Sequence, residues 1–302
     1  MKIAIAGGTG FVGKALVNHL IENNHEVVIL TRTLKNNDES GSIKYVQWLE
    51  KSANPLVSLQ ETDIFVNLSG ESINSGRWTE ERKKRIVDSR IQTVAEILNI
   101  MKRLDRKPLA LINASAVGFY GTSEIKMFTE KDAGANNDFL SRLVMEWEDK
   151  ASDASKLGIR TVLCRFGVIL DKNKGALPRM TLPYKAFVGG TVGNGRQWIS
   201  WIHIKDVVRG ILYAIDHDQI QGPVNFTAPN PISMKEFGLT LASVLHQPHW
   251  LPVPNFALQL LLGEMSTIVL EGQKVLPEKL LQSGFHFQYP ELNKALSNIF
   301  SN

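Results

Sequence analysis

The chain has 302 residues, of which 43% are apolar, so it is long enough to bury one large core or two of ordinary size. Its 34 Lys and Arg against 30 Asp and Glu leave a net charge of only +4, which does not favour a nucleic-acid-binding protein. The single cysteine, Cys164, lies in the apolar run "RTVLCRFGVIL" and is expected to be buried. This excludes a disulfide scaffold and a cysteine-rich metal site.

From the sequence we expect neither export nor insertion into a membrane. The N-terminus passes from one Lys into strand-like alternation and glycines, without the apolar stretch and cleavage site of a signal peptide. The apolar stretch "FALQLLLGEMSTIVL" is interrupted by Gln259, Gly263 and Glu264, so it falls short of the roughly 20 residues that a membrane span needs. We interpret it as a buried helix and expect a cytoplasmic protein.

Strand and helix patterns alternate through the first half of the chain. Apolar runs predict strands at "KIAIAG", "EVVIL", "DIFVNLS", "LALINASA" and "IRTVLCRF", and apolar positions at helical spacing predict helices over 11–23, 79–104 and 138–157. This order predicts the α/β class, a doubly wound parallel sheet covered on both faces. After residue 171 the sequence is irregular and rich in Pro and Gly, followed by a helix over 205–217, the strand "VNFTA" and a capping box at Ser233 and Glu236.

An early glycine turn gives the clearest functional signal. Gly7, Gly10 and Gly13 follow the first predicted strand and open an amphipathic helix. At such a turn, unpaired backbone amides and the positive end of the helix face a pyrophosphate, provided that no Cβ keeps it away. We therefore predict a dinucleotide-binding turn, formed by Gly7, Thr9, Gly10, Phe11, Val12 and Gly13.

The end of the second predicted strand indicates which dinucleotide is bound. NAD-selective sites place an acid there, whereas this chain reads "VVILTRT", with Thr31 and Arg32. A guanidinium at this place pairs with a 2′-phosphate through a charged hydrogen bond worth about 1.5 to 3 kcal/mol. We therefore predict NADP(H) in preference to NAD(H). Arg85 and Arg90, on the helix that follows "NLSG", are further candidates for this phosphate; all three arginines have the alternative of being solvated surface cations.

The glycine turn is followed by "DIFVNLSG", "INASAVGFYG", "LCRFGVIL", "GGTVGNGRQWISWIHIKDVV" and "EGQKVLPEKLLQSGF". Over nearly the full length, these segments resemble the extended short-chain dehydrogenase/reductases, and within them the sugar-nucleotide epimerase-like proteins called epimerase family proteins. The resemblance implies a Rossmann-like domain carrying NADP(H) and a smaller mixed α/β C-terminal substrate region with a domain of unknown function. The first would comprise 1–170 with 200–230, and the second 171–199 and 231–302, with a helical segment over about 248–296.

The resemblance also assigns individual residues. It implies that Leu68, Ser69 and Gly70 pass under the cofactor, and that Ser115 lies within one residue of the family's catalytic serine. Ordinary members transfer the proton with a Tyr that is followed four residues later by a Lys. This pair is missing, because none of the five tyrosines has a Lys at that distance.

Two apolar residues, Phe139 and Leu143, stand in the approximate positions of the missing pair. Tyr120 is the nearest phenol that could transfer a proton, and its alternative role is to line the substrate pocket. Nucleotide-sugar members carry an Arg seven residues before the Asp of the "IHxxD" segment, where this chain has Ile199. The candidate substrate residues are Arg165, Arg196, Trp201 and His203; for the last two, packing beneath the cleft is the alternative.

Two functions follow from these patterns. The first is an NADP(H)-dependent epimerase, reductase or dehydratase that acts on a small polar substrate, sugar-like or a nucleotide sugar. The second is an NADP(H)-responsive regulator or scaffold that has lost turnover, for which the missing pair is the reason. We expect no metal. We also expect no nucleic-acid partner, because the basic run "RWTEERKKR" contains interspersed acids. The resemblance allows a homodimer through the helices over 79–104 and 138–157.

Overall fold

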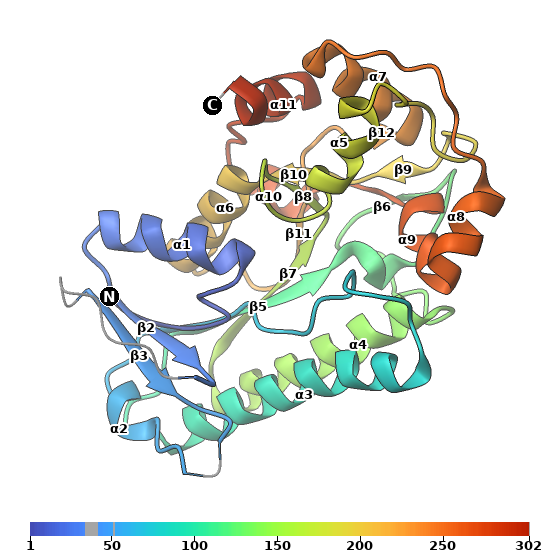
Figure 1. Ribbon diagram of the computed structural model, residues 1–302. Helices are drawn as coiled ribbons and strands as arrows, with labels where there is room; N and C mark the ends of the chain where they lie inside the picture. The colour runs from blue at the N-terminus through green and yellow to red at the C-terminus, as the bar shows by residue number, and fades with distance from the viewer. Residues whose placement is uncertain (34–41, 51, 302) are drawn as a thin grey trace.

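A seven-stranded parallel sheet forms the centre of the computed structural model, which describes residues 1–33, 42–50 and 52–301 (Figure 1). The strand order is β11-β7-β5-β4-β1-β2-β3, and every pair is parallel. The strands are β1 (Lys2–Ala6), β2 (Glu26–Thr31), β3 (Ile43–Gln47), β4 (Ile64–Asn67), β5 (Ala110–Ala116), β7 (Arg160–Phe166) and β11 (Gly222–Phe226). The predicted α/β class and parallel sheet are confirmed.

Helices cover both faces of this sheet. The helices α1 (Phe11–Glu22) and α6 (Ile204–Asp216) lie on one face, and α3 (Glu80–Arg103) and α4 (Phe139–Ser152) lie on the other (Figure 1). Side chains of β1 alternate between the two layers, since Ile3 and Ile5 pack in the core beneath α1 and α6, while Ala4 and Ala6 pack in the core beneath α3. The near-continuous apolar strands of the sequence are therefore buried on both sides.

The edge strand β3 was not predicted from the sequence. It pairs with β2 from Val27 and Ile43 to Thr31 and Gln47. Of its five residues only Val46 is buried, so the segment lacks the apolar run that marked the inner strands. A short helix, α2 (Leu56–Leu59), follows it.

The order in which the chain adds strands to the sheet reverses between β1 and β4. From β1 the chain builds outward through β2 and β3, and from β4 it builds the other way through β5, β7 and β11. In open α/β sheets, ligands bind beyond the carboxyl ends of the strands at such a switch point. The glycine turn after β1 and the segment after β4 meet there.

Shorter elements form a second region with its own core around Trp201 and Phe237. Its strand pairs are β8 (Val168–Leu170) with β10 (Trp201–His203), β9 (Trp198–Ile199) with β12 (Ile232–Ser233), and β13 (Lys274–Val275) with β6 (Met127–Phe128). Its helices are α5 (Leu177–Lys185), α7 (Met234–Leu245), α8 (Asn255–Leu262), α9 (Thr267–Leu270) and α11 (Leu292–Ser301), whereas α10 (Glu278–Gln282) packs its Leu280 in the core of the main sheet. Three single-turn helices are η1 (Val117–Tyr120), η2 (Asp153–Leu157) and η3 (Gly263–Ser266).

The stretch after residue 171 is more regular than its composition suggested. It contains α5, although Pro178 and Pro183 both lie within that helix. Pro178 stands in the first turn, where a backbone N–H has no intrahelical acceptor to lose. Buried Leu177 and Tyr184 then fix the helix against the second core.

The helix expected to be buried in "FALQLLLGEMSTIVL" is instead exposed, so that prediction is wrong. The structure divides the stretch into α8, η3 and α9, and α8 has no buried residue. Phe256, Leu260 and Leu261 are 71%, 79% and 68% exposed. Within the described ranges, no helix combines the length and apolarity needed to cross a membrane.

Candidate functional site

The glycine turn after β1 is packed too tightly for side chains. Gly7 has a φ of +81°, and a Cβ added to it would lie 2.7 Å from the carbonyl carbon and oxygen of Leu68. A Cβ added to Gly13 would lie 2.1 Å from the carbonyl oxygen of Gly7. Because both contacts are with backbone, no rotamer change relieves them, so glycine is required at both positions.

Helix α1 begins directly after this turn without a side-chain cap. Its N-cap is Gly10, and its first turn contains no acidic residue. The Gly10 amide donates to the Gly7 carbonyl at 2.9 Å, which closes the turn, and the amides of Phe11 and Val12 begin the helix. Those first amides have no intrahelical acceptor, so the positive helix end is available to an anion. The turn therefore fits the pyrophosphate of a dinucleotide.

A buried asparagine pair positions the segment after β4. Asn67 donates to the Oδ1 of Asn113 at 2.7 Å, and its own Oδ1 accepts hydrogen bonds from the backbone amide and hydroxyl of Ser69. Both asparagines are fully buried. They hold Leu68, Ser69 and Gly70 against the glycine turn. The sequence analysis missed this pair, because only the pairing of β4 with β5 brings Asn67, at the end of β4, opposite Asn113, in the middle of β5.

The residues predicted to select the cofactor lie at the carboxyl end of β2, next to β1 in the sheet. Thr31 donates its hydroxyl proton to the Thr33 carbonyl at 2.9 Å. Arg32 is exposed, and its carbonyl accepts from Gln47 at 3.1 Å. Since Ala6 pairs with Leu30, the turn that begins at Gly7 lies beside Arg32. The position fits the predicted 2′-phosphate contact.

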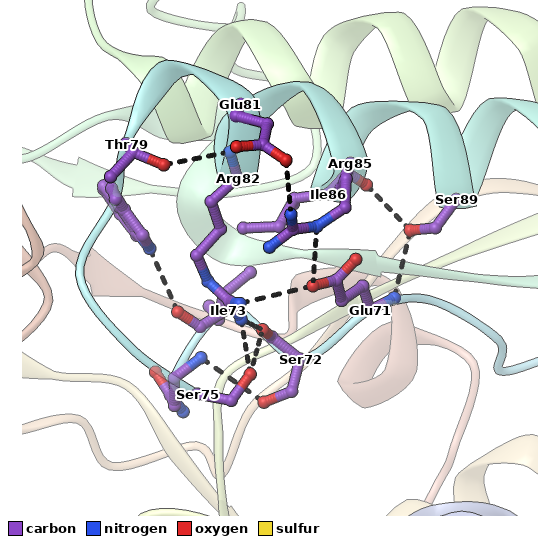
Figure 2. A network of polar contacts seen from close by, with 12 residues as sticks. Glu71, Ser72, Ile73, Ser75, Thr79, Glu81, Arg82, Arg85, Ile86 and Ser89 are labelled. Atoms are coloured by element: carbon purple, nitrogen blue, oxygen red, sulfur yellow. Dashed lines mark hydrogen bonds and ion pairs between the residues drawn. The ribbon is translucent and has the colours of Figure 1, made fainter.

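Arg85 and Arg90 have separate positions on α3. Arg85 pairs with Glu81 at 3.1 Å and with Glu71 at 3.6 Å, in the network that fastens the loop after β4 to the helix (Figure 2). Arg90 instead lies under Gly70, where a Cβ on that glycine would be 3.1 Å from its Cζ. Burial lowers the pKa of Arg90 to about 10, although the charge of Glu71 opposes this. Of these two arginines, only Arg90 therefore lies against Gly70.

A cavity of about 430 Å³ opens beyond the carboxyl ends of the strands. Its walls come from both regions of the chain, and they include Ala116 and Phe166 at the ends of β5 and β7, Phe139 and Leu143 on α4, and Trp198 and Ile268 of the C-terminal region. Phe11 of the glycine turn also lines it. The cavity is therefore continuous with the dinucleotide turn.

Residues 255–270, which we call the cover segment, close one side of this cavity. Arg77 donates to the carbonyls of Leu260 and Leu261 at 2.7 and 3.1 Å, and Lys83 pairs with Glu264 at 2.6 Å. These contacts tie the cover segment to the loop after β4 and to α3. The basic run "RWTEERKKR" thus holds parts of the protein together.

Phe139 and Leu143, which the sequence analysis put in the approximate positions of the missing Tyr and Lys, line the cavity wall. Neither side chain carries an ionisable proton. Asp138, the residue before them, caps α4 by accepting from the Ser141 amide at 2.7 Å. The described part of α4 therefore presents the cavity with apolar side chains.

The two predicted catalytic residues are turned into a buried network and do not line the cavity. Ser115 donates to Glu148, whose two carboxylate oxygens accept from Arg165 at 2.8 and 2.7 Å. Arg165 also donates to the Tyr120 hydroxyl at 2.8 Å, and Tyr120 donates to Asn225 at 2.8 Å. Side chains alternate along β5, so the cavity receives Ala116, which has no hydroxyl, in place of Ser115.

Tyr120 is poorly suited to proton transfer in this network. Burial raises the pKa of its phenol to about 12, in spite of the Arg165 charge beside it. At neutral pH it remains a protonated hydrogen-bond donor. The proton-transfer role and the pocket-lining alternative are both disfavoured by this geometry.

The four candidate substrate residues lie apart from the cavity walls. Arg165 is 2% exposed and belongs to the network just described. Trp201 is fully buried and donates to the Asn230 carbonyl at 3.1 Å. Arg196 lies outside with its side chain 76% exposed, 3.7 Å from Glu124. These positions favour packing for Trp201 and surface contact for Arg196.

His203 is a structural residue at the start of α6. Its Nδ1 accepts from the Lys205 amide at 3.1 Å, and its ring stacks on Tyr289 at 4.0 Å. Burial, with the charge of Lys205, lowers its pKa to about 4. Nearby Asp206 accepts from the amides of Gln288 and Tyr289 at 2.7 and 2.8 Å. The "IHIKD" segment thus fastens the end of the chain to the main sheet's helix layer.

Within residues 1–33, 42–50 and 52–301, no group of three or more His, Cys, Asp or Glu side chains has an arrangement that could hold a metal ion. Cys164 is 1% exposed, as its apolar surroundings predicted, and burial raises the pKa of its thiol.

Comparison with known proteins agrees with this arrangement. Residues 3–226 match the model of the "NAD dependent epimerase/dehydratase family". The chain belongs to that family. Residues 253–299 match a "Domain of unknown function (DUF1731)". The epimerase family protein YfhF of Bacillus subtilis is 48% identical over 301 residues, which cover 100% of this chain and 98% of that protein.

Two solved structures extend the comparison. The human epimerase family protein SDR39U1, solved with NADPH, has a TM-score of 0.90 at 32% identity, with both chains covered completely. A UDP-glucuronic acid 4-epimerase of Bacillus cereus has a TM-score of 0.80 at 16% identity, covering 100% of this chain and 98% of that one. The second match shows the fold alone. The family segment ends with β11, and the DUF1731 segment begins immediately before the cover segment.

Proposed function

We propose that this family member binds NADP(H) in the glycine turn and catalyses a redox or epimerisation reaction on a small molecule held in the adjoining cavity. The observation that carries the proposal is the backbone contact of the turn, in which Gly7 and Gly13 leave no room for a Cβ. Such a bare turn, opening directly into a helix, is what a pyrophosphate needs. The human relative of 32% identity was solved with NADPH.

The chain's own residues divide the work of cofactor binding. Phe11, Val12 and the neighbouring amides of α1 would face the pyrophosphate, and Ser69 and Gly70 would lie beneath the cofactor. Arg32 would pair with the 2′-phosphate, while the buried Arg90 supports Gly70. A bound nicotinamide dinucleotide supplies hydride-transfer chemistry. The apolar walls of the cavity would keep water from the reacting atoms.

The test of cofactor choice is calorimetry on protein freed of bound nucleotide. We expect NADP(H) to bind more tightly than NAD(H). Replacing Arg32→Ala should weaken NADP(H) binding about 10- to 150-fold, the equivalent of about 1.5 to 3 kcal/mol, and leave NAD(H) binding nearly unchanged. The matched control is Lys14→Ala, an exposed cation on α1. Equal affinity for the two dinucleotides in the wild-type protein would contradict the Arg32 assignment.

A second function is favoured by one specific observation. Phe139 and Leu143, the residues that the sequence analysis puts in the approximate positions of the proton-transferring pair, line the cavity, and Ser115 and Tyr120 are buried outside it. General acid–base catalysis contributes typically about 10²- to 10⁴-fold, so its loss suits a protein that senses NADP(H) without turnover. Exchange of isotope between nicotinamide-labelled NADPH and a broad set of candidate substrates separates the two functions. Exchange supports the enzyme, and tight binding without exchange supports the regulator.

A further inference from the structure

The cavity beside the glycine turn has mostly apolar walls, with neutral polar side chains such as Asn74, Ser200 and Gln273 and four charged ones among them. Aromatic rings come from the loop after β4, from α4 and from the C-terminal region, namely Trp78, Phe139, Trp147 and Trp198. Aliphatic side chains such as Leu143 and Ile268 fill the spaces between them. Sites lined this way bind through burial of apolar surface, and a few polar groups then fix the orientation of the ligand.

The charged side chains that line the cavity within the described residues already have partners. Glu264 pairs with Lys83 at 2.6 Å, and Glu271 accepts from the Thr122 hydroxyl at 3.0 Å. Asp138 accepts from the first turn of α4 at 2.7 Å. Arg90 donates to two backbone carbonyls at 3.1 and 3.0 Å. A ligand charge entering this space would have to compete with those contacts.

Cations of the protein itself lie close to the aromatic rings of the cavity walls. Lys83 lies 5.5 Å from the centre of the Phe139 ring, and Arg90 lies 5.1 Å from that of Trp147. Lys274 lies 4.4 Å from the centre of the Trp198 ring. Because three of the four rings already interact with a cation of the chain, the walls have little additional attraction for a cationic ligand.

A sugar nucleotide would need cations for its two phosphates, and the expected arginines are directed elsewhere. Arg196 is largely exposed and lies 3.7 Å from Glu124. Arg165 forms a two-point ion pair with buried Glu148. Bringing either guanidinium to a ligand would break an existing interaction, and for Arg165 it would leave Glu148 buried without its partner.

We propose that the substrate of this cavity is a neutral, apolar small molecule with a flat ring system, and not a nucleotide sugar. The inference rests on the proposed function, because it takes this cavity as the substrate site. The ring system of the substrate would pack against the aromatic walls, and the charged side chains of the cavity would keep the partners described above.

A matched set of ligands tests the charge and the polarity separately. 2-Acetylnaphthalene is neutral, 2-naphthoate carries a negative charge and 2-naphthyltrimethylammonium a positive one, while UDP-glucose represents the nucleotide sugars. Binding is measured by the quenching of Trp fluorescence and by calorimetry, with and without saturating NADPH. We expect the neutral compound to bind at least about tenfold more tightly than either ion, because a buried charge without a partner is costly. UDP-glucose should bind more weakly still.

Two variants place the binding in the cavity. Ile268→Arg introduces a cation into the wall, so it should weaken the neutral compound about tenfold and reverse the preference in favour of 2-naphthoate. The control is Val57→Arg, the same change at a position on α2 that is 76% exposed. It should leave all four affinities unchanged, because it lies outside the cavity. Tighter binding of UDP-glucose than of the neutral compound, or an unchanged preference in Ile268→Arg, overturns the inference.

The outcomes also separate this inference from the proposed function. If NADPH fails to bind but 2-acetylnaphthalene binds in the cavity, the cofactor proposal fails and the ligand class stands. If NADPH binds and the ions or UDP-glucose bind best, the ligand class is overturned and the cofactor proposal stands.

Discussion

The glycine turn and the cover segment both border the same cavity, yet they are built in opposite ways. The turn is made of backbone, packed so closely that a Cβ at Gly13 would lie 2.1 Å from a carbonyl oxygen. The cover segment is made of apolar side chains, and Leu260 in its first helix is 79% exposed. The spacing of glycines therefore predicts a close backbone contact from the sequence alone. Apolar composition does not predict whether a side chain is buried or which residues it contacts.

The largest expected effect on cofactor binding comes from adding one methyl group to the turn. Gly13→Ala places a Cβ against the Gly7 carbonyl, a clash that only a backbone shift relieves. We expect a loss of NADP(H) affinity of at least about a hundredfold, equivalent to about 3 kcal/mol, at the upper end of overpacking costs. Calorimetry measures it, and circular dichroism shows whether the fold survives. Lys14→Ala, one residue further along α1, should bind normally. Wild-type affinity in Gly13→Ala would refute the close-contact argument.

The largest expected effect on stability comes from the buried ion pair between Glu148 and Arg165. Glu148→Ala removes the carboxylate that pairs with buried Arg165, which leaves an uncompensated charge. We expect the free energy of unfolding to fall by about 3 to 5 kcal/mol, measured by urea denaturation. The neighbouring Asp149→Ala, at an exposed position, should change it by less than about 0.5 kcal/mol.

A double variant distinguishes the buried charge from lost packing. Glu148→Leu combined with Arg165→Met removes both charges and keeps apolar volume, so it should recover much of the lost stability. If the double variant is no more stable than Glu148→Ala, the cost is not that of an unpaired charge. The cost would then come from the lost hydrogen bond between Ser115 and Glu148.

The stability of the protein should fall in acid because of one buried histidine, His203. The folded protein holds the pKa of His203 near 4, while the unfolded chain has a value of about 6.5. Between these values the unfolded chain binds a proton that the folded protein does not, so stability is present above pH 6.5 and is lost as the pH falls towards 4. The loss should reach about 3 kcal/mol at the acid end.

His203→Asn isolates this contribution, because asparagine also caps helices. The variant should show a shallower fall of unfolding free energy between pH 6.5 and 4 than the wild type. His246→Asn is the matched control, since that histidine is exposed and has a positive φ of 54°, which asparagine tolerates. Identical pH slopes in the wild type and His203→Asn would show that protonation of this ring does not limit stability.

The sequence was sufficient for the parallel sheet and for the position of the glycine turn, because strand periodicity and glycine spacing are local properties. It was insufficient for Ser115, since a shift of one residue along β5 exchanges the two faces of the strand and gives the cavity Ala116. It also missed the Asn67–Asn113 pair, whose role depends on β4 and β5 being neighbours. Residues whose role comes from tertiary neighbours are the ones that pattern reading could not place.

The smallest effect is expected on the outer face of the cover segment. Leu260→Ser changes a side chain that is 79% exposed, so the free energy of unfolding should shift by less than about 0.5 kcal/mol. Leu262→Ser, in the same helix, alters a half-buried residue that packs in the cluster around Trp78 and Phe139, and it should cost about 1 kcal/mol or more. Urea denaturation of the two variants compares an outward and an inward apolar position on one helix. Equal losses would mean that Leu260 is also covered in solution, and the contrast between the packed turn and the exposed cover segment would fail.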